Sequence, residues 1–247
     1  MKVLFLIQSC NEERYINEEE LIKQTWLTRL RKNCDYYFYR GDGDNEIKGD
    51  TIFLNCNDDL KSTFQKTIMA MSIFKEENYD FIIRTNTSTW VNMELLMETL
   101  KNMDSSERFI YGGDMVVNAN TSGIPFMRGN FLIFNKTIIK DIFEALKIKP
   151  HYLGIDDITL ALTLFRYYKT INVDYLSIFK TLNHITYDDT TDESFIDNCI
   201  YVRCLEYIKE TNSSDILKKL DDIYINKKTI IPNKIQSIET FLGPLTI

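Results

Sequence analysis

Asp156 and Asp157 stand side by side at the start of an apolar pattern with helical spacing, in which Leu160 and Leu164 lie about one turn apart. A neighbouring carboxylate and partial burial can raise the pKa of an aspartate toward that of a useful general base. Aspartate is also common at ordinary helix starts, where it complements the helix dipole and accepts hydrogen bonds from free N–H groups. Both interpretations stay open, because an acid that begins a helix can also be catalytic.

A second segment joins an apolar strand to a cluster of small polar side chains. Residues 80–84 have the pattern of a buried strand, and Asn86, Thr87 and Ser88 follow it closely. Side chains at the carboxyl end of such a strand line the ligand site of many α/β proteins. The same residue types also cap helices, so the cluster predicts either a ligand site or a strand-to-helix cap.

Strand and helix patterns alternate through the early part of the chain, which predicts a parallel sheet with crossover helices. Gly129 interrupts a later strand pattern, and a glycine there indicates a bulge or a close approach of the backbone to another group. We expect strands at residues 3–7, 34–39, 51–54, 80–84, 109–117, 126–134 and 175–179. We expect helices at residues 17–30, 60–75, 93–103, 137–146, 156–168, 200–209 and 216–224.

Composition narrows the class of protein and of ligand. A net charge of -7 and a pI near 5.0 argue against a nucleic-acid binder, which needs clustered Lys and Arg. The five cysteines are scattered and form no C-x-x-C pair, so a reducing, cytoplasmic location is expected. No segment has the pattern of a signal peptide or the length of a membrane span. A position at a membrane surface stays open.

Several segments, taken in order, resemble the galactosyltransferase and fringe family of inverting β-1,3-glycosyltransferases. Residues 21–26 are similar to the family's I-R-x-T-W helix, residues 58–67 to D-S-Y-x-N-L-T-x-K-T, and residues 84–92 to K-T-D-D-D-V-F-V-N. Residues 155–161 resemble E-D-V-x-x-G, Gly129 falls at the family's glycine-rich strand, and His184 falls where a late histidine occurs. The R-T-N-x-S pattern also resembles uncharacterised bacterial and viral sugar transferases from polysaccharide loci.

The resemblance implies a GT-A fold, which is an α/β, Rossmann-like, mixed and mainly parallel sheet flanked by helices. It implies transfer of a sugar from a UDP-sugar to a glycan hydroxyl with inversion, giving a β linkage. Asp157 is then the base, and Asp156 its supporting or acceptor-binding neighbour. Trp90 is expected to line the sugar pocket. The residues expected to bind the UDP-sugar are Gln8, Ser9, Asn11, Asp58, Lys66, Arg84, Asn86, Ser88 and Arg128.

The chain departs from the family at the metal motif, where Asn86, Thr87 and Ser88 replace aspartates. Hard cations prefer carboxylate oxygen, so dependence on Mn²⁺ or Mg²⁺ is in doubt. If a cation is bound, its expected ligands are Asn86, Ser88 and His184; a histidine between apolar residues is otherwise a packing residue. Without a metal, Arg84, Arg128 and Lys66 are expected to neutralise the diphosphate, since guanidinium binds phosphate bidentately. The alternative for each is an ordinary solvated side chain.

The alternative function is a non-catalytic nucleotide-sugar or glycan-binding domain derived from a transferase, and a third is a nucleotide-sugar hydrolase. Residues 1–193 are expected to form the glycosyltransferase domain. Residues 194–247 are expected to form a helical C-terminal extension that packs on the same domain. The donor sugar, the acceptor, the linkage position and the oligomeric state do not follow from the residues.

Overall fold

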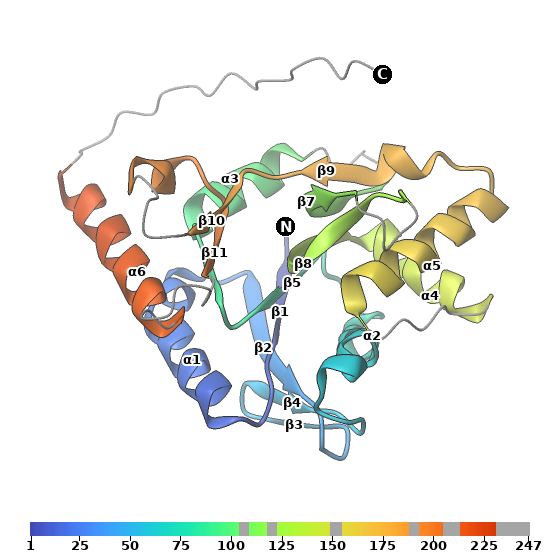
Figure 1. Cartoon of the computed structure of the whole chain (residues 1–247), viewed down its shortest axis with the longest axis horizontal. Coiled ribbons are helices and arrows are strands. Elements are labelled where there is room, and N and C mark those ends of the chain that lie inside the picture. Colours follow the sequence, from blue (N-terminus) through green and yellow to red (C-terminus); the bar gives the residue numbers. More distant parts are fainter. Residues whose placement is uncertain (104–108, 118–122, 149–154, 188–192, 205–212, 231–247) are drawn as a thin grey trace.

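The computed structural model describes residues 1–103, 109–117, 123–148, 155–187, 193–204 and 213–230. Its centre is a sheet of eight strands in the order β3-β4-β2-β1-β5-β8-β7-β9 (Figure 1). The strands are β1 (Val3–Gln8), β2 (Cys34–Arg40), β3 (Glu46–Lys48), β4 (Thr51–Phe53), β5 (Phe81–Asn86), β7 (Tyr111–Val116), β8 (Phe126–Asn135) and β9 (Phe179–Thr181).

The four neighbouring strands β4, β2, β1 and β5 are parallel, whereas β8 runs antiparallel to both β5 and β7. The expected class, a mixed and mainly parallel α/β sheet flanked by helices, is confirmed. In the register of β5 and β8, Thr85 lies opposite Phe131. The first half of β8 therefore lies beside the carboxyl end of β5, where the polar cluster begins.

Helices cover both faces of this sheet because alternate residues of β1 are apolar on both sides. Phe5 and Ile7 pack with α1 (Glu13–Gln24), α3 (Met93–Asn102) and α6 (Ser213–Ile230). Leu4 and Leu6 pack with α2 (Thr63–Phe74), α4 (Lys136–Lys147) and α5 (Asp156–Thr170). Figure 1 shows the two groups of helices on opposite sides of the sheet. A continuous apolar run is what a strand buried on both faces needs.

A second, smaller sheet joins β6 (Thr89–Val91) to later parts of the chain, in the order β10-β11-β6. Strands β10 (His184–Tyr187) and β11 (Tyr201–Cys204) are parallel, and β11 runs antiparallel to β6. Residues on both sides of the expected boundary at 193/194 thus share one sheet.

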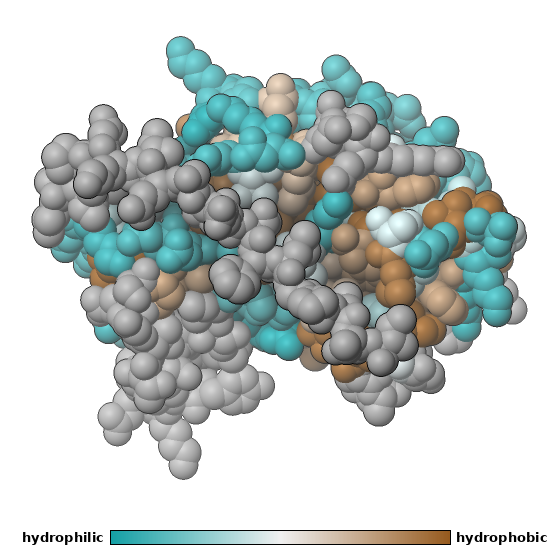
Figure 2. All heavy atoms as spheres, turned by 90° about the horizontal axis from the view of Figure 1, so that it is seen from above, coloured by the Kyte–Doolittle hydropathy of each residue, from teal (hydrophilic) through white to brown (hydrophobic). Residues whose placement is uncertain are grey.

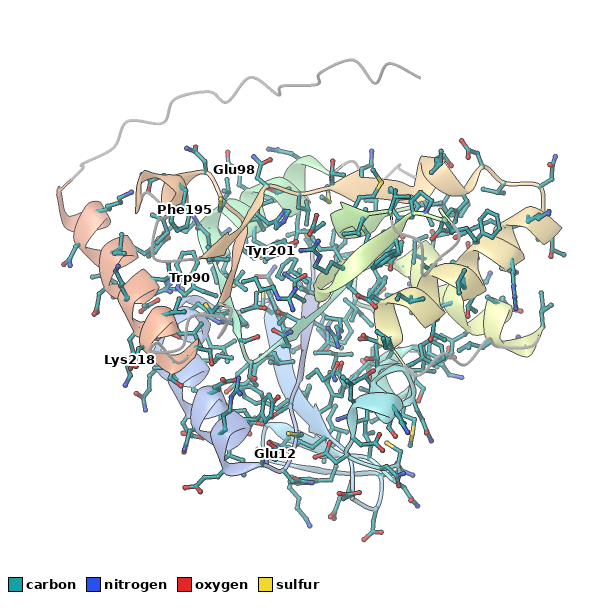
Figure 3. All side chains as sticks on the ribbon, in the orientation of Figure 1. Glu12, Trp90, Glu98, Phe195, Tyr201 and Lys218 are labelled. Atoms are coloured by element: carbon teal, nitrogen blue, oxygen red, sulfur yellow. The ribbon has the colours of Figure 1, made fainter. Side chains whose placement is uncertain are left out.

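Helix α6 packs on the hydrophobic core of the sheet through Ile216, Leu217 and Leu220. Its Asp221 forms an ion pair with Arg29 and accepts a hydrogen bond of 3.2 Å from Trp90 Nε1. Trp90 is fully buried, and Figure 3 shows it between the sheets and α6. The expectation that Trp90 lines a sugar pocket is therefore wrong, because its indole N–H is used to hold α6.

Two local expectations are also wrong. Residues 175–178 form the 3-10 turn η4 (Tyr175–Ile178), with the strand β9 beginning only at Phe179. Residues 201–204, expected to be helical, form β11, because β6 and β10 offer hydrogen-bonding partners on both sides. The rest of that expected helix, residues 205–209, lies outside the described residues. The short strands β3, β6 and β10 had no clear pattern of their own. The described residues also include the short 3-10 helices η1 (Trp26–Arg29), η2 (Leu60–Ser62) and η5 (Glu193–Asp197).

Figure 2 shows hydrophilic side chains over much of one face, with hydrophobic ones gathering at the right, on the side where Figure 1 places α4 and α5. The exposed Ile171 and Leu176 belong to the end of α5 and to η4. Within the described ranges, we find no helix that combines the length and the apolar character needed to cross a membrane.

Candidate functional site

A cleft of about 740 Å³ opens at the carboxyl ends of β1 and β5. It is bordered by the starts of α1, α2 and α5, by the first half of β8 and by β11. Loops meet there because the parallel strands all end at the same edge of the sheet. The residues expected at the site that line the cleft are Gln8, Ser9, Asp58, Lys66, Arg84, Asn86, Ser88, Arg128, Asp156 and Asp157. Asn11 and His184, also expected at the site, are not among the lining residues.

Asp156 is held at the floor of the cleft by a buried ion pair. Its Oδ2 lies 2.5 Å from Nη2 of Arg84, and the two side chains are 9% and 4% exposed. Arg84 Nε donates to the Tyr39 hydroxyl over 3.2 Å. The Thr67 hydroxyl lies 2.9 Å from the Tyr39 hydroxyl and donates a weak hydrogen bond of 3.4 Å to Asp156 Oδ2. Asp156 raises the pKa of Arg84 against the opposing effect of burial. Asp156 thus has a buried cationic partner of its own.

Asp157, the next residue, faces the cleft without a cation of its own among the described residues. Its Oδ2 accepts a hydrogen bond of 2.9 Å from the Gly129 N–H, and its Oδ1 accepts one from the Ile158 N–H. Burial, and then the negative charge of Asp156, raises the pKa of Asp157. A carboxylate with a raised pKa, oriented by a backbone N–H, is suited to accept a proton.

Gly129 lets β8 approach the two carboxylates. A Cβ atom at this position would lie 3.1 Å from Asp156 Oδ1 and 3.3 Å from Asp157 Oδ2. The close backbone approach that the sequence indicated at Gly129 is confirmed.

Lys66 and Asp58 form a second buried ion pair, with 2.7 Å between Nζ and Oδ1 and side chains 3% and 5% exposed. Asp58 also accepts hydrogen bonds from the N–H groups of Asn11 (2.6 Å) and Gly41 (2.9 Å). Asn11 in turn donates from Nδ2 to the Gly41 carbonyl, so its amide closes a loop beside the cleft. A side chain at Gly41 would press on the backbone of Asn57 and Asp58 at 2.7 Å. Lys66 and Asp58 therefore fix the loops around the first strand.

The polar cluster after β5 is a turn whose side chains bond to one another. Asn86 Oδ1 accepts hydrogen bonds from the hydroxyls of Ser88 (3.1 Å) and Thr89 (2.7 Å). The Thr87 hydroxyl instead turns away to donate to the fully buried carboxylate of Glu18. The predicted helix cap lies at Asn92, after β6, where the side chain accepts a hydrogen bond from the Leu95 N–H of α3. Residues 86–88 are instead a self-bonded turn that lines the cleft.

The residues at this turn do not fit a divalent cation. Among the residues that the structure describes, no group of three or more His, Cys, Asp or Glu side chains could hold a metal ion. Both lone pairs of Asn86 Oδ1 already accept hydrogen bonds, and hydroxyl oxygens are poor ligands compared with carboxylates. His184 Nε2 lies 3.1 Å from Asp114 Oδ2, outside the cleft lining. The three ligands expected for a cation are therefore not gathered at one point.

Sequence reasoning missed two arginines that border the same turn. Arg14 of α1 lines the cleft, is 46% exposed in its side chain, and lies 3.4 Å from the buried Glu18 that holds Thr87. Arg203 of β11 also lines the cleft and is paired in register with Thr89, and the Cys204 N–H donates to the Ser88 carbonyl. Arg14 had a signal, since it follows the first strand closely. Arg203 had none, because it enters through the pairing of two short strands.

Comparison with known proteins gives neither a matching family model nor a matching curated protein. Among solved structures, the chain is similar to the glycosyltransferase GlyE of Streptococcus pneumoniae, with 13% identity and a TM-score of 0.48 over 96% of this chain and 66% of GlyE. It is similar to the galactosyltransferase LgtC, solved with donor and acceptor sugar analogues, with 11% identity and a TM-score of 0.48 over 90% of this chain and 95% of that one. It is also similar to a glycosyltransferase involved in the glycosylation of the major capsid of PBCV-1, with 9% identity and a TM-score of 0.48 over 89% of this chain and 99% of that one. At these sequence identities and TM-scores, the similarities do not establish an activity for this chain.

Proposed function

We propose that the protein is a glycosyltransferase that moves a sugar from a UDP-sugar to a hydroxyl group of a glycan. The observation that carries the proposal is the position of Asp157. This carboxylate has a raised pKa, is oriented by the Gly129 N–H, and lines the same cleft as Gln8, Asn86 and the two arginines beside the turn. The motif resemblance in residues 21–184 supports the same reading.

In the proposed reaction Asp157 accepts the proton of the acceptor hydroxyl. The acceptor oxygen then forms a bond to the anomeric carbon of the donor, and the bond from that carbon to the diphosphate oxygen breaks. The electron pair leaves with UDP, whose negative charge grows in the transition state. A single displacement of this kind inverts the anomeric centre, so an α-linked donor gives a β-linked product.

Cationic side chains, rather than a metal ion, are proposed to stabilise the leaving UDP. Arg14 and Arg203 line the cleft near the Asn86–Ser88 turn, where the resemblance places the diphosphate. Guanidinium groups bind phosphate oxygens in a bidentate manner without a deprotonated ligand set. Lys66 and Arg84 are not given this role, because their side chains are only 3% and 4% exposed and lie in buried ion pairs with Asp58 and Asp156. Beside this turn, where Gln8 is paired in register with Asn86, the Gln8 side chain and the Ser9 hydroxyl are proposed to meet the nucleoside.

The fate of UDP and of the donor sugar tests the proposal. Calorimetry should detect UDP binding in the presence of EDTA, and Arg203→Gln should weaken it by about ten-fold, as loss of one charge-assisted contact implies. Arg166→Gln, which removes the same charge outside the cleft, is the matched control. Absence of UDP binding, or binding abolished by EDTA, would contradict the site as proposed.

A second candidate function is a binding domain without turnover. It is favoured by the turn at residues 86–88, which has no carboxylate for metal-assisted chemistry and whose Asn86 Oδ1 already accepts two hydrogen bonds. UDP-sugar binding with no transfer to any glycan acceptor, and no release of UDP, would select this candidate. Release of UDP without an acceptor would instead indicate hydrolysis.

A further inference from the structure

The positive charges of the cleft are not equivalent. Lys66 and Arg84 are both almost fully buried, in short ion pairs with Asp58 and Asp156. Arg128, which lines the cleft from β8, has a side chain that is 39% exposed, and it touches Asp114 through Nε at 3.2 Å. In the described part of the chain, its two terminal nitrogens have no ion-pair or hydrogen-bond partner. They can bind an anion from the cleft.

Asp114 holds Arg128 in place and is itself held by His184. Its Oδ2 lies 3.1 Å from His184 Nε2, and the imidazole ring stacks on Tyr201 with 5.4 Å between ring centroids. Tyr201 in turn stacks on Phe131 of β8 at 4.4 Å. Three strands thus hold the guanidinium group in one position, which favours bidentate recognition over a mobile surface contact.

Asn130, two residues further along β8, offers an unused polar group at the same border. Its side chain lines the cleft, is only 3% exposed, and neither its amide oxygen nor its amide nitrogen has a hydrogen bond of good geometry among the described residues. The Tyr201 hydroxyl contacts this amide and has no other hydrogen bond there. One contact with Tyr201 does not use all the donors and acceptors of an amide, and buried polar groups are rarely left unsatisfied, so Asn130 has capacity for a further polar partner.

The border formed by Arg128 and Asn130 lies next to the base. Gly129, between these two residues, is the one whose N–H donates to Asp157. A ligand whose hydroxyl group reaches Asp157 therefore lies in the same cavity as the side chains of Arg128 and Asn130.

We propose that the acceptor is an acidic sugar, and that Arg128 binds its carboxylate or phosphate group while Asn130 donates a further hydrogen bond. The inference rests on the proposed function, because it takes the ligand at Asp157 to be the acceptor. It moves Arg128 from the diphosphate, where the sequence placed it, to the acceptor. Asp114 and His184 are positioning residues for this arginine. Since the chain carries a net charge of -7, anions gain no general attraction to it, and an acidic sugar must be bound locally.

The test measures binding of three small glycosides by saturation-transfer NMR and calorimetry, with the protein saturated with UDP. Methyl β-glucuronide carries a carboxylate, glucose 6-phosphate carries a phosphate, and methyl β-glucoside is neutral. At least one acidic sugar should bind about ten-fold more tightly than the neutral one, as one charge-assisted bidentate contact implies. The carboxylate and phosphate arms show which group is preferred.

Arg128→Gln should remove the preference for acidic sugars and leave UDP affinity unchanged, whereas Arg166→Gln should alter neither. Equal binding of acidic and neutral sugars, or a preference that survives Arg128→Gln, overturns the inference. Loss of UDP affinity in Arg128→Gln also overturns it, because the arginine would then bind the diphosphate. If UDP does not bind at all but acidic sugars bind through Arg128, the anion site stands and the proposed transferase function fails.

Discussion

Removal of one partner from the ion pair between Arg84 and Asp156 should destabilise the protein strongly, whereas removal of both should not. The two side chains are 4% and 9% exposed, so each single substitution leaves a charge with little access to water. Breaking a buried pair in this way costs about 3–5 kcal/mol. For a chain of this size, about 2–4 °C of Tm per kcal/mol gives a fall in Tm of about 10 °C for Asp156→Ala.

The double variant Arg84→Met/Asp156→Leu should recover most of this loss. Apolar residues of similar volume often replace a buried ion pair at little cost. The hydroxyls of Tyr39 and Thr67, which both contact the pair, lie 2.9 Å apart and keep each other as partners.

Urea unfolding followed by tryptophan fluorescence measures these changes, because Trp26 and Trp90 are both fully buried. Lys147→Met, which removes a cation from an exposed pair with Glu144, is the control and should leave the unfolding midpoint unchanged. The reasoning is refuted if the single variants match the wild type, or if the double variant is as unstable as the sum of the singles.

Three further outcomes follow from the site. Asp157→Asn should raise stability at neutral pH. The pKa of Asp157 is higher in the native than in the unfolded protein, so native stability falls as pH rises between these two pKa values, and an amide avoids that loss. Thermal scans across pH that give equal curves for the wild type and the variant would argue against this. For the same reason, the apparent pKa of the acid limb of the pH–rate profile should lie above the range of ordinary aspartates. An apparent pKa within that range would exclude Asp157 as the base. Glu18→Gln should lower the free energy of unfolding by about 1–3 kcal/mol and weaken UDP binding, because the Glu18 carboxylate contacts Thr87, Ser213 and Arg14. Urea titration measures the stability and calorimetry the UDP affinity. Unchanged UDP affinity would argue against a role of Arg14 in UDP binding.

Much of the central sheet could be predicted because its strands carry local signals. The apolar run at residues 3–7 and the alternating pattern of strands and helices are sufficient to indicate a parallel sheet. Residues 201–204 were assigned to a helix because their strand character depends on β6 and β10, which are distant in sequence. Pairing between short strands leaves almost no trace in a local pattern.

The site could be predicted as far as strand ends and helix starts define it. Asp156, Asp157 and Asn86 follow from that rule, and all three line the cleft. The interaction partners of the site residues could not be predicted, since no local pattern shows that Arg84 forms an ion pair with Asp156 or that His184 contacts Asp114. The same limit misplaced Trp90, whose indole is taken up by α6.

Turnover by Asp157→Asn tests the central claim most directly. With a UDP-sugar that the wild type uses, the variant should bind UDP with unchanged affinity, because Asp157 contacts the acceptor and not the nucleotide in the proposed reaction. Product formation should fall by about 10²–10⁴-fold, the usual contribution of a general base. Transfer at the wild-type rate by Asp157→Asn would contradict the claim that this carboxylate accepts the acceptor's proton.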